Sequence, residues 1–342
     1  MYLYLSRGCV FCGPTNHTTV QKSTLKWLAV VEFSFLHRLR NWFFIFSHPL
    51  YKQLYILLSI SKSPQYPAIA SIIQTATMGS SIPAQLPAMA TSPKHIFFTD
   101  FDGTITSRDS NDYMTDNLGF GQPTRLALNR QVLANEITFR SAFKQMLDSV
   151  PTPFDQCTNI LLERIELDPG FRAFYDWAKA NNVPIVILSG GMTPIIRALL
   201  DKLLGEDSSW MQIVSNDVGA RPGKSINEEK GWEIVFHDET GFGHDKSSTI
   251  RPYAALPADQ RPTMFYAGDG VSDLSAAKET DLLFAKKGHD LVTYCVKQHV
   301  PFYEFEDWTT ILAQVQSIVS GAKSVKQVSA EGVEAFTAAL KA

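Results

Sequence analysis

The sequence predicts an α/β fold in which a parallel sheet is flanked by helices and a small helical cap is inserted after the first strand. Three short apolar runs carry this prediction, because each is followed by polar residues and a glycine. The runs lack the polar alternation of half-exposed strands, which is typical of strands covered by helices on both faces. The core is therefore expected to be Rossmann-like, with strands at residues 95–100, 183–189 and 264–267.

The composition is that of an ordinary globular protein. The chain has 342 residues, a net charge of -3, 19% charged residues and 45% hydrophobic residues. This balance gives no basic excess suited to nucleic acid, so no nucleic-acid partner is expected. The four cysteines are too few and too scattered for a disulfide framework, which favours a reducing compartment and a cytoplasmic location.

The N-terminal part, residues 1–93, is expected to be a disordered or targeting extension. Before Asp100 the only acidic residue is Glu32, against eight basic residues, as in organellar transit segments. The apolar run 42–60 is a candidate membrane anchor, but Lys52 at its centre opposes insertion into a membrane. Residues 1–77 could instead be an upstream extension that the functional protein lacks. An organellar location applies only if they form a genuine targeting segment, and no membrane association is expected elsewhere.

The extension is expected to end in a flexible lead-in, because residues 79–93 are small, polar and interrupted by proline. After the first strand the pattern becomes helical. Apolar residues fall on one helical face between 137 and 149, and similar stretches lie near 123–135, 153–165 and 169–181. A crossover connection between two parallel strands usually needs only one helix, so the additional helices predict an inserted cap.

The predicted domain boundaries follow from these patterns. Residues 107–181 are expected to form the cap, and 94–106 together with 182–318 the core. Residues 211–245 contain two short β-type runs around a turn-rich segment, which predicts a strand followed by a hairpin. Residues 319–342 are expected to be a tail with an exposed helix.

Acidic side chains gather where the predicted strands end. Asp100 and Asp102 follow the first strand, and Asp269 and Asp273 follow the strand at 264–267. An Asp-Gly pair alone indicates no more than a turn. Four carboxylates at one rim would repel one another, by about 4 kcal/mol for a pair 4 Å apart at an effective dielectric near 20, so the cluster predicts a bound cation. A set of oxygen ligands without His or Cys favours Mg²⁺.

Phosphate-ester chemistry needs a nucleophile, a proton for the leaving group and donors for the phosphate oxygens. Asp100 would attack phosphorus, and Asp102 would protonate the leaving group and then activate water. Ser189 and the Gly190 amide would donate to the phosphate oxygens, and Lys246 would offset their charge. Taken singly, SGG is typical of a turn and most lysines lie on the surface, so the order of the motifs carries the argument. His244 and Asp245 are interpreted as structural.

These motifs resemble the four signatures of the haloacid dehalogenase superfamily over residues 94–315: DFDGT at 100–104, Ser189 in ILSGGM, Lys246, and GDGVSD at 268–273. The resemblance implies Asp100 as nucleophile, Asp102 as general acid and base, and Ser189 and Lys246 as phosphate ligands. It also implies that Mg²⁺ is held by Asp100, the Asp102 backbone carbonyl and Asp269, with Asp273 in support.

The second aspartate favours a phosphatase over a dehalogenase, and the helical insert resembles the cap of the phosphoserine phosphatase branch. Within that branch, residues 100–121 are more similar to fungal-type phosphatases of the methionine-salvage diketo-methylthio-phosphopentane and to phosphocholine/phosphoethanolamine phosphatases. Asp109 falls near an acidic substrate-contacting position of the branch; it is equally consistent with a solvated residue at the cap hinge.

The sequence therefore predicts a Mg²⁺-dependent phosphatase that hydrolyses a small phosphorylated metabolite through an aspartyl-phosphate intermediate. Two alternatives remain. A phosphotransferase or phosphomutase would use the same site with a second hydroxyl as acceptor, and a regulatory protein would keep the scaffold without turnover. The physiological substrate and the oligomeric state stay open.

Overall fold

The computed structural model describes residues 86–341 of the chain. The alternatives considered for residues 1–77 lie outside the described part. Among residues 86–341, none of the helices combines the length and the apolar character needed to cross a membrane.

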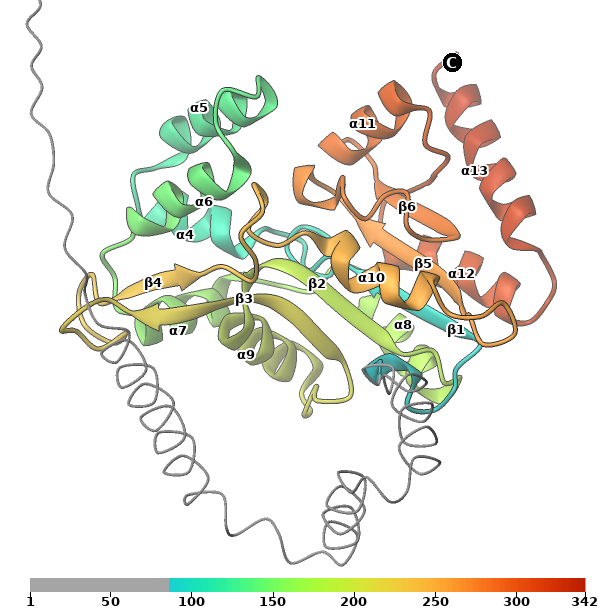
Figure 1. Cartoon of the computed structure of the whole chain (residues 1–342), viewed down its shortest axis with the longest axis horizontal. Helices are drawn as coiled ribbons and strands as arrows, with labels where there is room; N and C mark the ends of the chain where they lie inside the picture. Colours follow the sequence, from blue (N-terminus) through green and yellow to red (C-terminus); the bar gives the residue numbers. More distant parts are fainter. Residues whose placement is uncertain (1–85, 342) are drawn as a thin grey trace, which may run out of the picture. The chain divides into compact units, whose positions relative to one another are not determined.

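The core is a seven-stranded sheet with the order β4-β3-β2-β1-β5-β6-β7 (Figure 1). All neighbouring strands are parallel except β3 and β4, which form an antiparallel pair. The predicted α/β fold is therefore confirmed, and the hairpin expected between 211 and 245 is the β3–β4 pair. The strands are β1 (His95–Thr99), β2 (Ile185–Met192), β3 (Gln212–Ala220), β4 (Trp232–Val235), β5 (Thr263–Gly268), β6 (Leu282–Lys286) and β7 (Tyr303–Phe305).

The register of the central strands brings their carboxyl ends to one edge. Thr99, the last residue of β1, pairs with Ile187 of β2 and with Ala267 of β5. The residues that follow these positions are Asp100, the Ser189 turn and Asp269. In open α/β sheets, ligands bind at this edge.

One face of the sheet is covered by α8 (Phe171–Ala180), α9 (Thr193–Leu204) and α12 (Trp308–Val319). Side chains alternate between the two faces of a strand, and Phe97 of β1 points to this face. Its ring packs against Phe174 of α8 at 4.7 Å between centroids. Burying an aromatic ring of this kind contributes about 1.5–3 kcal/mol.

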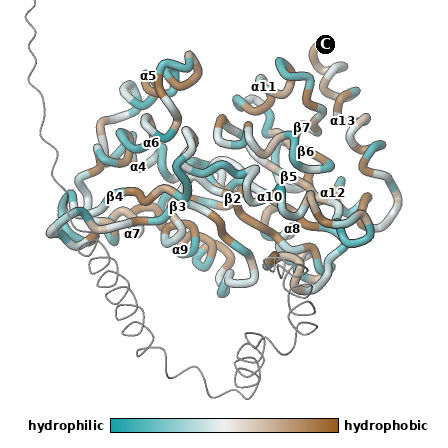
Figure 2. The backbone as a smooth tube through the Cα atoms, in the orientation of Figure 1, coloured by the Kyte–Doolittle hydropathy of each residue, from teal (hydrophilic) through white to brown (hydrophobic). Residues whose placement is uncertain are grey.

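The opposite face is covered by α10 (Lys246–Ala254) and α11 (Asp290–Gln298). Ile96 and Phe98, the neighbours of Phe97, point here, and the Phe98 ring meets Tyr253 of α10. Because both faces are covered, the central strands are hydrophobic along most of their length, as β2 is in Figure 2.

The cap consists of α4 (Ser110–Leu118), α5 (Gln122–Leu133), α6 (Phe139–Asp148) and α7 (Phe154–Arg164). The helical stretches expected near 123–135, 137–149 and 153–165 correspond to the last three. The chain enters and leaves the cap side by side. The Ser107 N–H donates to the Glu166 carbonyl at 3.0 Å, and Thr106 forms an antiparallel bridge with Leu167.

The helix expected near 169–181 is present as α8, but it packs on the sheet. Phe174 contacts Trp308 of α12 at 4.7 Å between ring centroids, in addition to Phe97. Its aromatic side chains are therefore buried in the core layer. We propose that the cap ends near residue 167, earlier than the expected boundary at 181.

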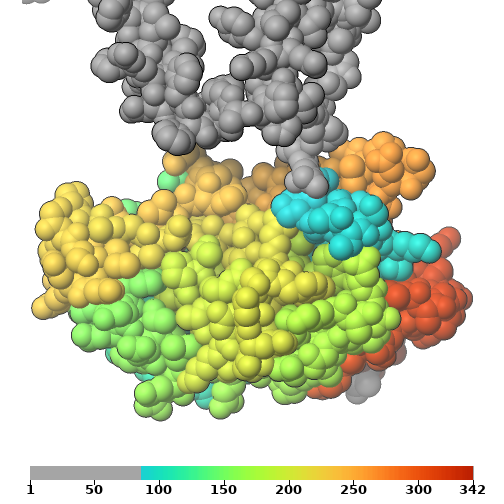
Figure 3. Space-filling model, turned by 90° about the horizontal axis from the view of Figure 1, so that it is seen from below, coloured from blue at the N-terminus to red at the C-terminus, as the bar shows by residue number. Residues whose placement is uncertain are grey.

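The expected flexible lead-in is wrong for its last part, because residues 86–93 pack on the core. A 3-10 helix, η2 (Pro87–Met89), buries Ala88 to 7% exposure, and the Ala88 N–H donates to the Tyr253 hydroxyl at 3.4 Å. In Figure 3 this segment, in cyan, lies directly on the surface of the folded unit. The burial of apolar side chains explains why this segment packs against the core.

The tail forms the helix α13 (Val325–Ala339), which is anchored to the core rather than wholly exposed. Val328 is fully buried, and the Phe336 ring meets Phe302 at 5.0 Å between centroids. An added Cβ at Gly332 would approach the Phe302 carbonyl to 2.8 Å, so glycine permits the helix to lie close to the β7 segment.

Candidate active site

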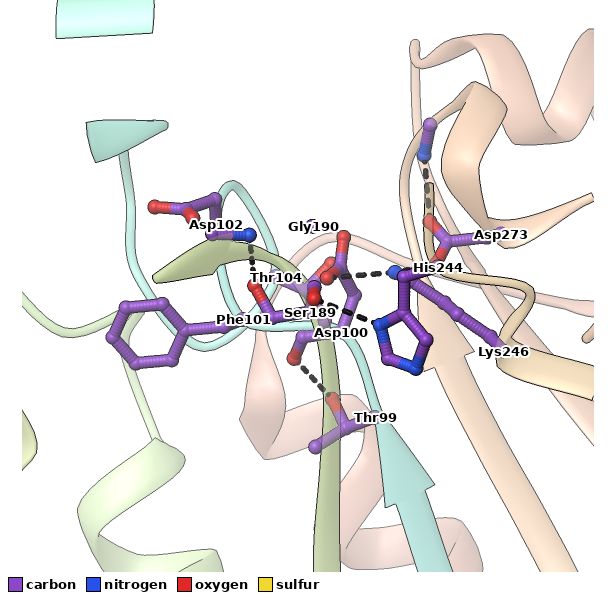
Figure 4. A network of polar contacts seen from close by, with 12 residues as sticks. Thr99, Asp100, Phe101, Asp102, Thr104, Ser189, Gly190, His244, Lys246 and Asp273 are labelled. Carbon is purple, nitrogen blue, oxygen red and sulfur yellow. Dashed lines mark hydrogen bonds and ion pairs between the residues drawn. The ribbon is translucent and has the colours of Figure 1, made fainter. Parts of the chain in front are cut away.

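Asp100 occupies the first position beyond β1. Its N–H donates to the Ala267 carbonyl at 2.9 Å, which continues the pairing of β1 with β5. The residue is only 5% exposed, and its Oδ1 lies 2.8 Å from the Lys246 Nζ (Figure 4). The carboxylate therefore points into an enclosed site and has one oxygen fixed by a cation.

Lys246 is the first residue of α10, whose N-terminus is capped by the Asp245 side chain. The lysine is fully buried, and its Nζ also lies 2.7 Å from the Asp273 Oδ1. Burial alone would lower the pKa of Lys246, but the attraction of Asp100 and Asp273 outweighs it and raises the pKa. The Lys246 side chain therefore stays protonated and forms ion pairs with both carboxylates.

Asp273 ends the 3-10 helix η3 (Val271–Asp273), and both of its carboxylate oxygens are already engaged. Oδ1 accepts from Lys246 and from the Tyr266 hydroxyl, and Oδ2 accepts from the N–H groups of Asp269 and Gly270 at 2.9 Å each. This pattern fixes the turn that carries Asp269. It leaves Asp273 little capacity for a direct metal bond.

Asp269 faces Asp100 across the site, and carboxylate oxygens of Asp100, Asp269 and Asp273 lie within 4.8 Å of one another. Burial, followed by repulsion from Asp273, raises the pKa of Asp100 well above its ordinary value, although Lys246 opposes the shift. The three carboxylates together therefore carry more negative charge than Lys246 alone can balance. An all-oxygen set of this kind fits Mg²⁺.

Asp269 has two further neighbours. The His289 Nδ1 lies 3.1 Å from its Oδ2, and the Thr104 hydroxyl donates to its Oδ1 at 3.4 Å. Gly103 adopts a φ of +74°, and a Cβ there would meet the Asp269 Oδ2 at 2.6 Å. Glycine at 103 therefore permits both the turn after Asp102 and the approach of Asp269.

Asp102 points toward the cap. Its Oδ1 accepts from the Ser110 N–H and its Oδ2 from the Asn111 Nδ2, each at 2.8 Å, at the start of α4. Burial, followed by repulsion from Asp109, raises the pKa of Asp102 to about 8. A carboxyl that keeps its proton at neutral pH can act as an acid toward a leaving group.

Asp109 is the N-cap residue of α4, and its Oδ1 accepts from the N–H groups of Asn111 and Asp112 at 2.7 and 2.9 Å. Burial raises the pKa of Asp109. Arg125 lies 2.6 Å from Asp112 and links α5 to α4. Asp109 therefore caps α4, and its charge lies close enough to Asp102 to raise the pKa of that carboxyl.

Ser189 and Gly190 lie where β2 leaves regular pairing, because the register with β3 shifts between Ser189 and Met192. The Ser189 hydroxyl accepts from the Gly191 N–H at 2.9 Å. A Cβ at Gly191 would lie 3.0 Å from the Asp102 Oδ2, whereas one at Gly190 would meet no atom within 4 Å. The turn thus borders Asp102 and leaves open space beside Gly190.

The structure pairs Lys246 with Asp100 and Asp273 and places carboxylate oxygens of Asp100, Asp269 and Asp273 within 4.8 Å of one another, with Asp102 and the Ser189 turn alongside. Sequence reasoning missed four participants. Tyr266 stands inside the apolar run before Gly268, and its hydroxyl was the available signal. Ser110 and Asn111 were missed because the run after Asp109 lacks an apolar face, and His289 because β6 was not predicted.

The ends of the parallel strands gather aspartates, one buried lysine and a serine turn, an arrangement that suits the hydrolysis of a phosphate ester. Residues 97–278 match the model of haloacid dehalogenase-like hydrolases. The chain belongs to this family, as its motifs predicted.

Three relatives are similar to this chain, and two of them are named as phosphatases. Pdp3-interacting factor 1 of Schizosaccharomyces pombe is 51% identical over 231 residues, covering 67% of this chain and 98% of that protein. Polyol phosphate phosphatase of Saccharomyces cerevisiae is 50% identical over 242 residues, covering 69% and 98%. 2-Hydroxy-3-keto-5-methylthiopentenyl-1-phosphate phosphatase of Bacillus cereus is 28% identical over 223 residues, covering 65% and 96%. The expectation of a phosphatase is confirmed at this level.

Proposed function

We propose that the protein is a Mg²⁺-dependent phosphatase that hydrolyses polyol phosphates through a phosphorylated Asp100. The observation that carries the proposal is the buried arrangement in which Lys246 bridges Asp100 and Asp273 while Asp269 faces Asp100. Such a site supplies a nucleophile and opposes charge on a transferring phosphoryl group.

In the first half of the reaction, the free carboxylate oxygen of Asp100 attacks phosphorus. The bond from phosphorus to the ester oxygen breaks, and its electron pair stays on the departing oxygen, which takes the proton held by Asp102. Protonation of this kind contributes about 10² to 10⁴ in rate.

In the second half, Asp102, now ionised, removes a proton from water. The water oxygen attacks phosphorus, the bond to Asp100 breaks, and inorganic phosphate leaves. Through both halves, Ser189, the Gly190 amide and Lys246 donate to the phosphoryl oxygens. Asp102 thus acts first as an acid and then as a base.

When bound, Mg²⁺ would neutralise phosphoryl oxygens and lower the repulsion between the phosphate and Asp100. We propose that Asp100, Asp269 and the Asp102 backbone carbonyl hold it. The sequence prediction also included Asp273. Its oxygens are occupied by four donors, so we assign Asp273 the role of holding Lys246 and the Asp269 turn.

A polyol leaving group suits the cap side of the site. Asp102, Asp109 and Asp112 lie together there with Asn111, and burial raises the pKa of Asp112 to about 8. Hydroxyl groups can both donate to and accept from such carboxyls and amides. The 50% identity with a polyol phosphate phosphatase over nearly its whole length supports the same class.

The methionine-salvage substrate predicted from the sequence is the second candidate. It is supported by the 28% identity with the bacterial methylthiopentenyl-phosphate phosphatase. An apolar methylthio tail would gain little from the acidic cap residues, so we place the methylthiopentenyl phosphate after polyol phosphates.

We propose a cytoplasmic location. The buried free thiols of Cys157 and Cys295 support it, because a reducing compartment keeps thiols unpaired.

The test is a panel of linear polyol phosphates, the methylthiopentenyl phosphate, phosphocholine and phosphoserine, each with and without Mg²⁺. We expect hydrolysis that requires Mg²⁺, with the highest kcat/KM for polyol phosphates. Asp100→Asn should abolish turnover and keep the fold by circular dichroism. Undiminished turnover in this variant contradicts the mechanism. Transfer of phosphate to added alcohols would favour a phosphotransferase, and ligand binding without turnover a regulatory protein.

A further inference from the structure

Two backbone carbonyls in the Ser189 turn are held by side chains from elsewhere in the chain. The Ser189 carbonyl lies 2.9 Å from the His244 Nδ1, and the Gly190 carbonyl accepts from the Asn216 Nδ2 at 2.6 Å. Both contacts lie where the register of β2 with β3 shifts after Ser189, and each carbonyl is held there by a side chain from outside β2.

The direction of one carbonyl fixes the direction of the next N–H. A trans peptide is planar, with its C=O and N–H pointing in opposite directions, and residues 86–341 contain no cis peptide bond. The contact of His244 with the Ser189 carbonyl therefore sets where the Gly190 N–H points. In Figure 4 a dashed line joins the His244 ring to Ser189.

His244 is well suited to hold this carbonyl. It is 2% exposed and packs against the His237 ring at 4.6 Å between centroids. Burial lowers the pKa of His244 to about 4, so the ring is neutral at physiological pH. Because a carbonyl can only accept, Nδ1 carries the ring proton. Nε2 is buried and has no hydrogen-bond partner among residues 86–341.

His244 also joins two parts of the site that come from different loops. It precedes Lys246 by two residues, and the Asp245 N–H between them donates to the Asp238 Oδ2 at 2.6 Å. The ring therefore connects the loop that delivers Lys246 to the turn that carries Ser189 and Gly190. Movement of either loop would break the contact.

We propose that His244 is a positioning residue that orients the Gly190 amide toward the phosphoryl group by holding the Ser189 carbonyl. The inference rests on the proposed function, because it requires phosphate to bind at this turn. His244 touches neither substrate nor metal and acts through the peptide that it holds. Asn216 holds the next peptide in the same way.

The test compares His244→Asn with His244→Leu. The two side chains have nearly the same shape, but only the asparagine amide can donate from the position of Nδ1. The probe is inorganic phosphate, measured as an inhibitor of p-nitrophenyl phosphate hydrolysis with Mg²⁺ and by calorimetry. Thermal unfolding of each variant accompanies the measurement, and His244→Met, which also lacks a donor, replaces the leucine variant if the latter does not fold.

We expect His244→Leu to raise the inhibition constant for phosphate by about three- to tenfold, the effect of one lost neutral hydrogen bond. His244→Asn should stay within about twofold of the original protein. Equal constants for all three proteins, or equal weakening in both variants, would overturn the proposal. If the unaltered protein neither binds phosphate nor hydrolyses the ester, the proposed function fails first, so the two failures are distinguishable.

Discussion

Replacing Lys246 with methionine should destabilise the folded protein in a pH-dependent way. The methionine side chain is also long and unbranched, so it fills most of the space but carries no charge. Asp100 and Asp273 would then remain buried without the cation that lies 2.8 and 2.7 Å from them. Each contact is worth about 6 kcal/mol at an effective dielectric near 20, before desolvation is subtracted.

The net loss should be about 3–5 kcal/mol at pH 8, the range for removing one partner of a buried ion pair. The pKa of Asp100 is already raised, so the folded state binds its proton more tightly than the unfolded chain does. Without Lys246 the pKa rises further, and stability falls more steeply as pH increases through this range. The deficit should therefore be smaller at pH 5.5 than at pH 8, because lower pH favours the protonated, uncharged carboxyl.

Urea unfolding at pH 8 and pH 5.5 measures both effects. Lys287→Met is the matched control, because Lys287 pairs with Glu306 on the surface and both side chains are largely exposed. Its loss should stay within about 1 kcal/mol. A deficit for Lys246→Met equal to that of the control, or one that does not change with pH, would refute the reasoning.

Three further predictions follow from the site. Gly103→Ala should weaken Mg²⁺ activation at least about tenfold, because a Cβ would meet the Asp269 Oδ2 at 2.6 Å, and should also cost about 1–2 kcal/mol of stability, because alanine is strained at a φ of +74°. Titration of the folded variant's activity with Mg²⁺ checks this, and an unchanged midpoint would count against the assigned metal position. Since the pKa of Asp102 is about 8, kcat/KM for an alkyl phosphate should fall by about tenfold per pH unit above pH 8, as Asp102 loses its proton. The kcat/KM for p-nitrophenyl phosphate should not fall in this way, because its leaving group does not need a proton. Identical pH profiles for the two substrates would exclude Asp102 as the acid. Because the pKa of His244 is lowered in the folded state, its contribution to stability is complete above pH 6.5 and is lost as pH falls toward 4. The free energy of unfolding should therefore fall by about 2 kcal/mol between pH 8 and pH 5. Urea unfolding measures this fall, and His244→Asn should abolish this part of it.

The fold was predictable where hydrophobic pattern and chemistry coincide. The strands β1, β2 and β5 end in polar residues and glycine, so both signals mark them. β6 and β7 were not predicted: LLFAK ends in lysine rather than in an acidic or serine turn, so no chemical signal marks it, and YEF alternates at the sheet edge. The helix α4 (SNDYMTDNL) was also missed because it has no apolar stripe; the Asp109 cap and the Asp102 contacts stabilise it instead.

The candidate site was predictable as a set of carboxylates and one lysine, because motif order carries that information. The parts that hold them were not. Asn216 lies on β3 and His244 in the loop between β4 and α10, and both reach the Ser189 turn only through the tertiary fold, which no local sequence pattern reports. The pairing of Lys246 likewise depends on Asp273, which also accepts from the Tyr266 hydroxyl, and both residues lie far from Lys246 in the chain.

The most direct test of the central claim is to trap phosphate on Asp100. Enzyme quenched in acid during turnover of a polyol phosphate is treated with borohydride, which reduces an acyl phosphate to an alcohol, and peptide mass spectrometry then locates the reduced residue. The account predicts reduction at position 100 alone, only in enzyme quenched during turnover and not in Asp100→Asn. A reduced residue elsewhere, or steady release of phosphate with position 100 never modified, would contradict it.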